Sequence, residues 1–351
     1  MEKAIKQSVG IDCGQEELVA AFGIMCQDYG IRIISHKAFP NHAEGFEDLL
    51  EWSKKLRQKE VEVNFVVEST GVYHEEVALF LHKQKQFISV VLPNKIKHFS
   101  GTENIKNVTD RIAARIIAKF GLEKKLDRWT PPAKVFNELK QLTREREQLN
   151  VELTIVRNQL HAEKAGAWPN KGSIKRMNSR ITLLKKQQEQ IVKEIKSILD
   201  KNPELKARIA NVCTIKGIGL LTAVTVVAET NGFNLIRNKK QLVSYAGLDV
   251  EHKTSGTSVN TKPRMSKKGN KYLRKAFYMP ALTAIRHDER AKGIFARLVS
   301  RHGIKMKAAV AIHRKLLELV YTLWKKNEPF DPEFSQKKLE QPIETALNEM
   351  A

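Results

Sequence analysis

Short apolar runs and amphipathic stretches alternate over the first 120 residues. Three apolar runs follow one another closely from residue 8, which favours an antiparallel meander of three strands. Stretches with apolar positions at helical spacing then alternate with further apolar runs. We expect strands at 8–14, 17–25, 31–39, 63–70 and 87–93, and helices at 42–56, 74–84 and 108–120. This order predicts a mixed sheet with helices packed on it.

The pattern changes after the prolines at 131 and 132, because proline lacks an amide hydrogen and disfavours a helix before it. From there to residue 200, two apolar stripes at helical spacing are flanked by Lys, Arg, Glu and Gln, and the sequence GAWPNKG separates them. The stripes consist of Val135, Leu139, Leu142, Leu149, Leu153, Val156 and Leu160, and of Ile174, Met177, Ile181, Leu184, Ile191, Ile195 and Ile198. They predict a helical hairpin with coiled-coil character, folded on itself or paired between subunits.

The rest of the chain to residue 327 has a mostly helical pattern with glycine-rich turns and one dense basic stretch. A length of 351 residues suits two domains and a connector. We therefore predict an α/β domain at 1–132, a coiled coil at 133–201, a helical domain at 202–328 and a polar, loosely ordered tail at 329–351.

Net charge limits the possible classes of function more than any other feature of the composition does. The formal charge is +22, and a protein this basic usually meets a polyanion, with nucleic acid first. A hydrophobic content of 42% is sufficient for a core and excludes wholesale disorder. The three cysteines lack metal-ligand spacing, which argues against a disulfide framework or zinc site. Without a signal core or an apolar run near the ~18 residues of a membrane span, we expect a cytoplasmic protein.

Three acidic residues are candidates for a metal site. Asp12 and Glu68 each end a predicted apolar strand, and neighbouring strand ends can lie side by side. Asp110 lies in the first turn of the helix at 108–120. Clustered carboxylates bind hard divalent ions such as Mg²⁺, which stabilise the attacking and leaving oxygens of phosphoryl transfer. Each acid alone also has an ordinary interpretation, as a turn cap or as a partner of the helix dipole.

Two stretches in the second half are typical of phosphate binding. Lys216, Gly217 and Gly219 form a tight turn before a helix, where backbone amides can hold a phosphate, although tight helix packing also explains the glycines. The second stretch is a basic run with the density of a phosphate footprint. Its candidate nucleic-acid-binding residues are Lys262, Arg264, Lys267, Lys268, Asn270, Lys271, Arg274 and Lys275.

Serine hydroxyls lie beside a glycine just before the basic run, in the sequence KTSGTS. A serine near several cations could attack a phosphate, because the cations or metal-bound oxygens stabilise the charge that develops. A polar turn beside a phosphate-binding loop is the simpler alternative, and spacing alone does not choose between Ser255 and Ser258.

Taken in order, these motifs resemble a known family. GID, VVESTGVY, TDRIAARIIAKFG, the central stripes, GIG, AGL, SGTS and SKKGNKYLR follow one another over about residues 8–327. The chain is similar to the DEDD-type transposases of the insertion-sequence family IS110, which are relatives of the Piv DNA invertase. Each motif is short, and their joint order makes the resemblance specific.

The resemblance implies a fold and a mechanism. It implies an N-terminal RNase H-like domain related to Holliday-junction resolvases, a coiled coil, and a helical transposase domain with a helix-hairpin-helix-like turn. Asp12, Glu68 and Asp110 match the first three acids of a Mg²⁺-binding tetrad, and Ser255 matches a nucleophilic serine that forms a covalent bond to DNA. Ala113 stands where the fourth acid is usual, so water or an acid such as Glu103 would complete the metal shell.

The family's partners follow from the same resemblance. Members recombine target and donor DNA under the direction of a non-coding bridge RNA. They assemble as homo-oligomers, dimers that form tetramers, in the bacterial cytoplasm and at the nucleoid when active. Two rivals stay open: a metal-dependent junction nuclease that uses water, and a nucleic-acid-binding protein whose catalysis the alanine has weakened.

Overall fold

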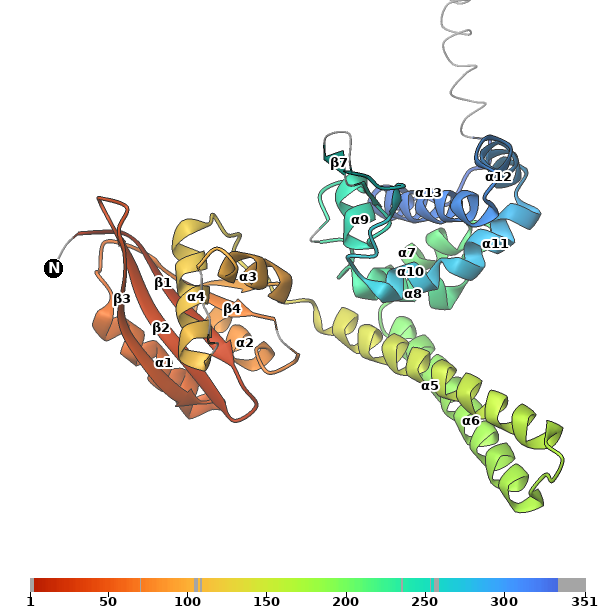
Figure 1. Ribbon diagram of the computed structural model, residues 1–351, viewed down its shortest axis with the longest axis horizontal. Coiled ribbons are helices and arrows are strands. Elements are labelled where there is room, and N and C mark those ends of the chain that lie inside the picture. Colours follow the sequence, from red (N-terminus) through yellow and green to blue (C-terminus); the bar gives the residue numbers. More distant parts are fainter. Residues whose placement is uncertain are drawn as a thin grey trace, which may run out of the picture. The chain divides into compact units, whose positions relative to one another are not determined.

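The computed structural model describes residues 3–333 except 70, 104–106, 108, 235, 253 and 256–258. It consists of two compact units, Met1–Pro131 and Pro132–Ala351. Figure 1 identifies their elements along the chain.

The first unit is built on a mixed five-stranded sheet. Its strands are β1 (Ala4–Cys13), β2 (Glu17–Cys26), β3 (Ile31–Pro40), β4 (Val63–Glu68) and β5 (Phe87–Val91). They lie in the order β3-β2-β1-β4-β5. The first three strands form the predicted antiparallel meander, and β4 and β5 continue the sheet in parallel with β1. This is the strand order of the RNase H fold, so the predicted fold class of this region is confirmed.

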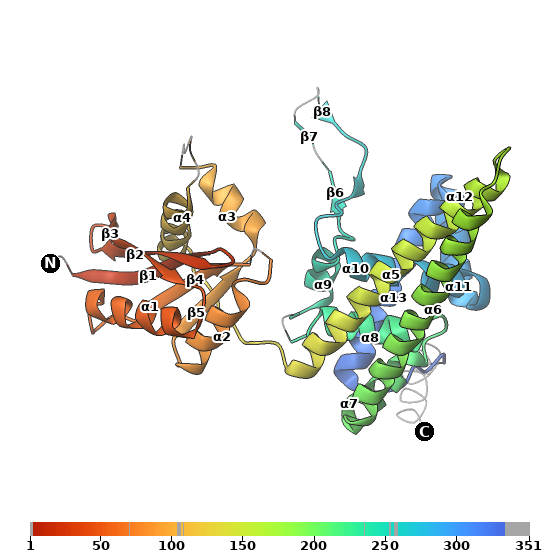
Figure 2. The same ribbon diagram turned by 90° about the horizontal axis from the view of Figure 1, so that it is seen from below.

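Helices cover both faces of the sheet, as the view in Figure 2 shows. The helices of this unit are α1 (Ala43–Leu56), α2 (Glu75–Lys83), α3 (Pro93–Ser100) and α4 (Asp110–Glu123). α1 and α2 pack on one face, where Val9, Ile11 and Phe22 are buried. α4 lies on the opposite face, with α3 beside it.

Small residues allow α4 to lie directly on β1. A Cβ atom on Gly10 would be 2.1 Å from the backbone nitrogen of Ala118 and 2.3 Å from the carbonyl oxygen of Ala114. A Cβ atom on Gly121 would be 2.3 Å from Ser8 Oγ. The helix backbone and the strand backbone are therefore in contact, which fixes the first turn of α4 over the end of β1.

The second unit is mostly helical. It begins with the hairpin of α5 (Lys134–Ala165) and α6 (Lys171–Asp200), which Figure 1 shows side by side. Then follow α7 (Pro203–Cys213), α8 (Leu220–Glu229), α9 (Lys239–Tyr245), α10 (Lys271–Ala276), α11 (Tyr278–His287), α12 (Glu289–His302) and α13 (Lys305–Lys326). Two short ladders interrupt the helices: β6 (Val250–Glu251) with β9 (Arg264–Met265), and β7 (Thr254–Ser255) with β8 (Val259–Asn260).

One hydrophobic core runs through this unit. It includes Leu139 and Val156 of α5, Ile191 of α6, Val224 of α8 and Leu317 of α13. The hairpin thus shares its core with the helices that follow it. The boundary at 201/202 and the domain limits built on it stay predictions, and most of the tail at 329–351 lies outside the described residues. Within the described part of the chain, the structure has no helix with both the length and the apolar character that a membrane crossing requires.

Candidate active site

The register of the sheet brings two of the predicted acids to the same face. Gly10 of β1 pairs with Val66 of β4, so Asp12 and Glu68, each two residues further along, point to the same side. This is the side that α4 covers, because Gly10 contacts the α4 backbone. Asp110 is the first residue of α4, and Thr109 caps the helix by accepting a hydrogen bond from the amide of Ile112 at 3.4 Å. All three acids therefore lie at one edge of one sheet face.

The electrostatics agree with this placement. The pKa of Asp12 is raised to about 6, first by burial, then by the charge of Asp110 and that of Glu68. The pKa of the neighbouring Cys13 thiol is raised to about 12 by burial and by Asp12 and Glu68. The negative charges thus act on one another, and their shared field favours the arrival of a cation.

The three carboxylates do not form a closed coordination site. Among the described residues, no group of three His, Cys, Asp or Glu side chains is gathered closely enough to hold a metal ion. The chemistry of the donor set still fits a divalent ion such as Mg²⁺, which prefers oxygen ligands and retains several waters. The three carboxylates therefore interact electrostatically, but in this structure they do not gather around a single point where an ion would be coordinated.

The fourth position of the expected tetrad has no acid. Glu103, which was suggested as its substitute, is held away from that position by an ion pair. Ala113 is half-buried on α4, one turn after Asp110. Glu103 accepts a hydrogen bond from Lys119 Nζ at 2.5 Å. Lys119 is nine residues beyond Asp110, which is about 13 Å along a helix with a rise of 1.5 Å per residue. The ion pair thus holds Glu103 toward the second half of α4.

Ser255 lies in the other unit. It is exposed on β7 and pairs with Val259 of β8 in a short hairpin. The hairpin follows β6 and precedes β9, which pair with each other and form its base. The predicted loop is therefore partly ordered as strands. Ser258, the alternative nucleophile, lies outside the described residues.

The basic run separates into side chains that face solvent and side chains that shape the loop. Arg274 Nη1 donates to the carbonyl oxygens of Ala246 at 2.8 Å and Gly269 at 3.0 Å. Asn270 Oδ1 accepts from the amides of Tyr272 at 2.9 Å and Leu273 at 3.1 Å, which caps α10. The internal contacts of Arg274 and Asn270 fix the loop conformation.

The lysines and the remaining arginine of the run are more accessible. Lys268 pairs with Glu251 at 3.0 Å, and Lys275 pairs with Glu147. The exposed members of the run are Lys262, Arg264, Lys267, Lys268, Lys271 and Lys275. Because long side chains on a surface rearrange readily, these residues have the access that a nucleic-acid backbone requires.

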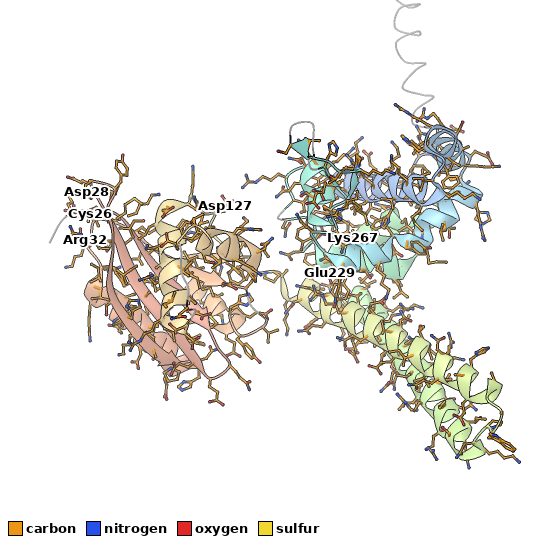
Figure 3. All side chains as sticks on the ribbon, in the orientation of Figure 1. Cys26, Asp28, Arg32, Asp127, Glu229 and Lys267 are labelled. Atoms are coloured by element: carbon orange, nitrogen blue, oxygen red, sulfur yellow. The ribbon has the colours of Figure 1, made fainter. Side chains whose placement is uncertain are left out.

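A buried glutamate organises this region, and the sequence analysis missed it. The Glu229 side chain is only 1% exposed and accepts two hydrogen bonds from Arg144, Nε at 2.6 Å and Nη2 at 2.9 Å. Asn270 Nδ2 donates to the same carboxylate at 2.7 Å. The Arg144 guanidinium lies 4.5 Å from the centre of the Tyr272 ring. Figure 3 labels Glu229 and Lys267 within this unit. One signal was available: Glu229 is a lone acid at the end of an apolar helix.

The predicted glycine turn connects α7 and α8. Gly217 has a φ of +91°, and a Cβ atom there would be 2.9 Å from the carbonyl oxygen of Pro280. Gly219 precedes α8 and has open space at its Cβ position. Lys216 Nζ lies 3.5 Å from the carbonyl oxygen of His287. Gly217 is thus explained by backbone conformation and packing, while Gly219 leaves the start of α8 accessible.

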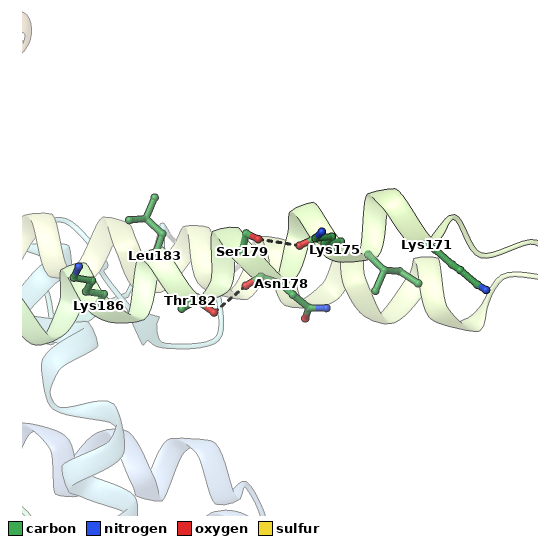
Figure 4. Close-up of a pocket in the computed structure, with 8 residues that line it drawn as sticks. Lys171, Lys175, Asn178, Ser179, Thr182, Leu183 and Lys186 are labelled. Atoms are coloured by element: carbon green, nitrogen blue, oxygen red, sulfur yellow. Dashed lines mark hydrogen bonds between the residues drawn. The ribbon is translucent and has the colours of Figure 1, made fainter.

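A shallow hollow along α6 has a different character. Lys171, Lys175 and Lys186 line it together with Ser179 and Thr182. Figure 4 shows the two hydroxyls bonded within α6, Ser179 to the carbonyl oxygen of Lys175 and Thr182 to that of Asn178, each at 3.1 Å. Because these hydroxyls are already used by the helix, we assign no chemistry to the hollow.

Comparison with known proteins identifies the family. Residues 9–163 match a family described as Transposase, and residues 209–296 match one described as Transposase IS116/IS110/IS902 family. The chain belongs to the IS110 family of transposases. It is therefore a DNA-binding enzyme that cleaves DNA strands, and its DEDD class implies the use of a divalent metal.

Several proteins are similar to this IS110-family transposase. It is 26% identical over 335 residues to the pilin gene-inverting proteins of Moraxella bovis and Moraxella lacunata, which covers 93% of this chain and 98% of each relative. It is 23% identical over 146 residues to an IS110 protein of Streptomyces coelicolor, covering 41% of this chain and 35% of that protein. A structure of T. thermophilus RuvC in complex with Holliday junction substrate is 13% identical and covers 32% of this chain and 90% of its own, with a TM-score of 0.26. That score is too low to carry an argument, so the fold assignment rests on the strand order.

Proposed function

We propose that this transposase is an RNA-guided DNA recombinase that inserts and excises a mobile element through a covalent serine–DNA intermediate. The observation that carries the proposal is the placement of Asp12, Glu68 and Asp110 at one edge of an RNase H-like sheet. The relatives from Moraxella are named pilin gene-inverting proteins, which supports recombination of defined DNA segments.

The acids have one role in this proposal. Asp12, Glu68 and Asp110 would hold Mg²⁺, which supplies electrostatic stabilisation to the phosphoryl transfer when bound. Because the pKa of Asp12 is raised to about 6, this carboxylate is mainly ionised at neutral pH but gains a proton in mild acid. Ala113 reduces the number of charged ligands, so metal affinity is expected to be lower than that of a complete tetrad.

Ser255 has the second role. Its Oγ attacks the phosphorus of the cleaved linkage, a serine–phosphate bond forms, and the bond from phosphorus to the leaving sugar oxygen breaks. The serine proton leaves and the sugar oxygen takes up a proton, so the step is balanced and reversible. The exposure of Ser255 on a projecting hairpin supports this role, because a duplex backbone can approach it.

The remaining parts of the proposal concern partners. A bridge RNA would pair with target and donor DNA, while the exposed cations of the basic run and the turn at Lys216, Gly217 and Gly219 hold backbone without reading sequence. Asp12 and Ser255 belong to separate compact units, which is compatible with acids of one subunit meeting a serine of another in a tetramer. Sequencing of RNA that co-purifies with the protein tests the guide.

The serine intermediate is tested by trapping protein–DNA adducts. Ser255→Ala is expected to abolish the adduct and the recombined junctions, while Ser258→Ala retains both. Adducts that persist in the Ser255 variant would remove this residue from the mechanism. Cleavage without any adduct in the native protein would favour the rival function, a metal-dependent junction nuclease that uses water.

A further inference from the structure

The sheet face that carries the acids continues to the edge strand. β3 is at the edge of the sheet. His36 of β3 pairs with Ala21 of β2, and Ala21 pairs with Gly10 of β1. Directly paired residues point to the same side, so His36 faces the side on which α4 lies. The His36 side chain is exposed.

One side of α4 overlooks this part of the sheet. Arg111 and Arg115 are four residues apart and therefore neighbours on the helix surface. Leu122 lies on the same side, seven residues after Arg115, and reaches β2 and β3. A Cβ atom on Gly23 would be 3.1 Å from both Leu122 Cδ1 and Ile33 Cδ1. The two arginines thus face the strip of sheet that presents His36.

The electrostatics of His36 agree with this arrangement. The pKa of His36 is lowered by partial burial, then by the charges of Arg111 and Arg115. A neutral imidazole near guanidinium groups retains one N–H donor. The three side chains together offer several hydrogen-bond donors and two fixed positive charges.

The two arginines of this cluster are not engaged in an ion pair within the described part of the chain. Among the described residues, no carboxylate pairs with Arg111 or Arg115, and the buried Nε of Arg115 has no hydrogen-bond partner. Lys119, one turn further along α4, provides the contrast because it is paired with Glu103. Two adjacent guanidinium groups outside any ion pair repel each other, and an anionic ligand that binds both would relieve this repulsion.

Other cations of β3 do not belong to the cluster. Lys37 pairs with Ala20 and lies over the Phe39 ring, 5.1 Å from its centre, on the face packed by α1. Arg32 pairs with Ile24, whose side chain is buried on that same face. The cations on the α4 side are thus gathered beside the acids instead of being spread over the edge.

We propose that His36, Arg111 and Arg115 bind the phosphate backbone of DNA next to the acid cluster. Arg111 directly follows Asp110, so a strand whose cleaved phosphate lies at the acids would meet the two guanidinium groups with its neighbouring phosphates. Guanidinium groups bind phosphate oxygens in pairs, and the contact requires no particular base. The inference rests on the proposed function, since the bound strand is the one to be cleaved.

The test uses the full-length protein and a DNA duplex that carries one end of the element. Affinity is measured by fluorescence anisotropy across a salt series in EDTA, so that no cleavage takes place. Arg111→Gln/Arg115→Gln is expected to weaken binding about tenfold and to reduce the salt slope by about 2, the value for two lost phosphate contacts. Arg111→Lys/Arg115→Lys, which retains the charges, should keep most of the slope.

The matched control removes the same charge from the opposite face. Lys55 lies in the last turn of α1 and Arg57 is the C-cap of that helix, and both are exposed. Lys55→Gln/Arg57→Gln should change affinity less than twofold. Circular dichroism and melting verify that both double variants are folded.

Three outcomes would overturn the inference. The glutamine variant could keep the native salt slope, it could lose no more affinity than the control, or its loss could appear with RNA but not with DNA. Failure of the serine adduct assay is distinguishable from these outcomes, because the binding measurement in EDTA requires no chemistry. The native protein could form no adducts while its glutamine variant still loses DNA affinity. The phosphate-binding role of the cluster would then stand, and only the recombinase mechanism would be contradicted.

Discussion

Asp12 is the residue whose properties depend most on its neighbours. Burial, Asp110 and Glu68 together raise its pKa from 3.8 to about 6. The folded state therefore holds the proton more tightly than the unfolded state does. Stability that Asp12 contributes in its protonated form is present below about pH 4 and is lost as the pH rises through about 6.

Asp12→Asn should consequently stabilise the protein at neutral pH in EDTA. The free energy of unfolding should rise by about 1 kcal/mol at pH 7, because solvent screening at this partly exposed site reduces the full effect of the pKa shift. This gain should disappear near pH 4, where the native aspartate is protonated. Urea unfolding at both pH values measures the difference. Asp48→Asn, on the exposed side of α1, is the control for the loss of one carboxylate. An equal gain for Asp12→Asn at both pH values would contradict the argument.

Ala113 is the second residue with a measurable consequence. Ala113→Asp adds a carboxylate one turn from Asp110, which should raise the affinity for Mg²⁺ or Mn²⁺ about tenfold and increase DNA cleavage. Ala113→Asn has nearly the same shape without the charge and should change neither. Calorimetric metal titration and a cleavage assay provide the two readouts. Unchanged affinity would show that position 113 does not face the metal, and activity in neither protein would favour a nucleic-acid-binding function.

At this scale, the sequence was sufficient to predict where the acids lie, while their role in metal binding stays a prediction. Asp12 and Glu68 follow from strands that end in acids, and the observed register places them on one face. Ser255 follows from the family resemblance alone and stays a prediction. Glu229 was missed, because an acid at a helix end is usually solvated and only the fold shows that Arg144 and Asn270 surround it.

At the scale of elements, the contact between β1 and α4 determines the position of Asp110. Gly10→Ala would place a Cβ atom within 2.3 Å of two α4 backbone atoms, which cannot move aside as a flexible side chain would. We expect a loss of about 3 kcal/mol in the free energy of unfolding, at the upper end of overpacking costs. Metal affinity should fall too, because α4 carries Asp110.

Gly101→Ala is the control for this substitution. Gly101 has a helical φ of −62° and its nearest contact for a Cβ atom is at 3.4 Å, so the added methyl group is accommodated. Urea unfolding of both variants, with metal titration of the folded state, measures the two effects. A Gly10 variant as stable as the Gly101 variant would mean that α4 moves away from β1 without cost.

The elements themselves were largely predictable. The strands of the first unit and its helices α1, α2 and α4 follow from apolar periodicity, and their order limits the sheet to few topologies. The short helix α3 was not predicted. The short ladders β6–β9 and β7–β8 were not predicted, because two-residue strands leave no periodic pattern. The division of the basic run into loop-forming and exposed side chains was not predictable either, since only the fold distinguishes Arg274, which bonds to carbonyl oxygens, from the exposed Arg264.

At the scale of the whole molecule, the apolar clusters determine where the chain can be divided. The residues of the first unit's apolar clusters lie between Ala4 and Trp129 in the sequence. The residues of the second unit's cluster lie between Val135 and Phe330. A cut between Pro131 and Pro132 therefore separates complete cores. Nearly all of the net charge of +22 belongs to the second piece, where it favours solubility through self-repulsion, and it does not determine the fold.

Fragments 1–131 and 132–351 are accordingly expected to fold separately, each with a cooperative melting transition. A fragment 202–351, which begins at the predicted end of the coiled coil, should not fold, because its core would lose Leu139 and Ile191 and its buried Glu229 would lose Arg144. An uncompensated buried charge alone costs about 3–5 kcal/mol. Circular dichroism, calorimetry and a dye that binds exposed apolar surface distinguish folded from unfolded fragments.

Glu229→Gln in fragment 202–351 removes the charge without restoring the core. Recovery of folding in this variant would show that the charge, and not the shared core, joins the hairpin to the helices after it.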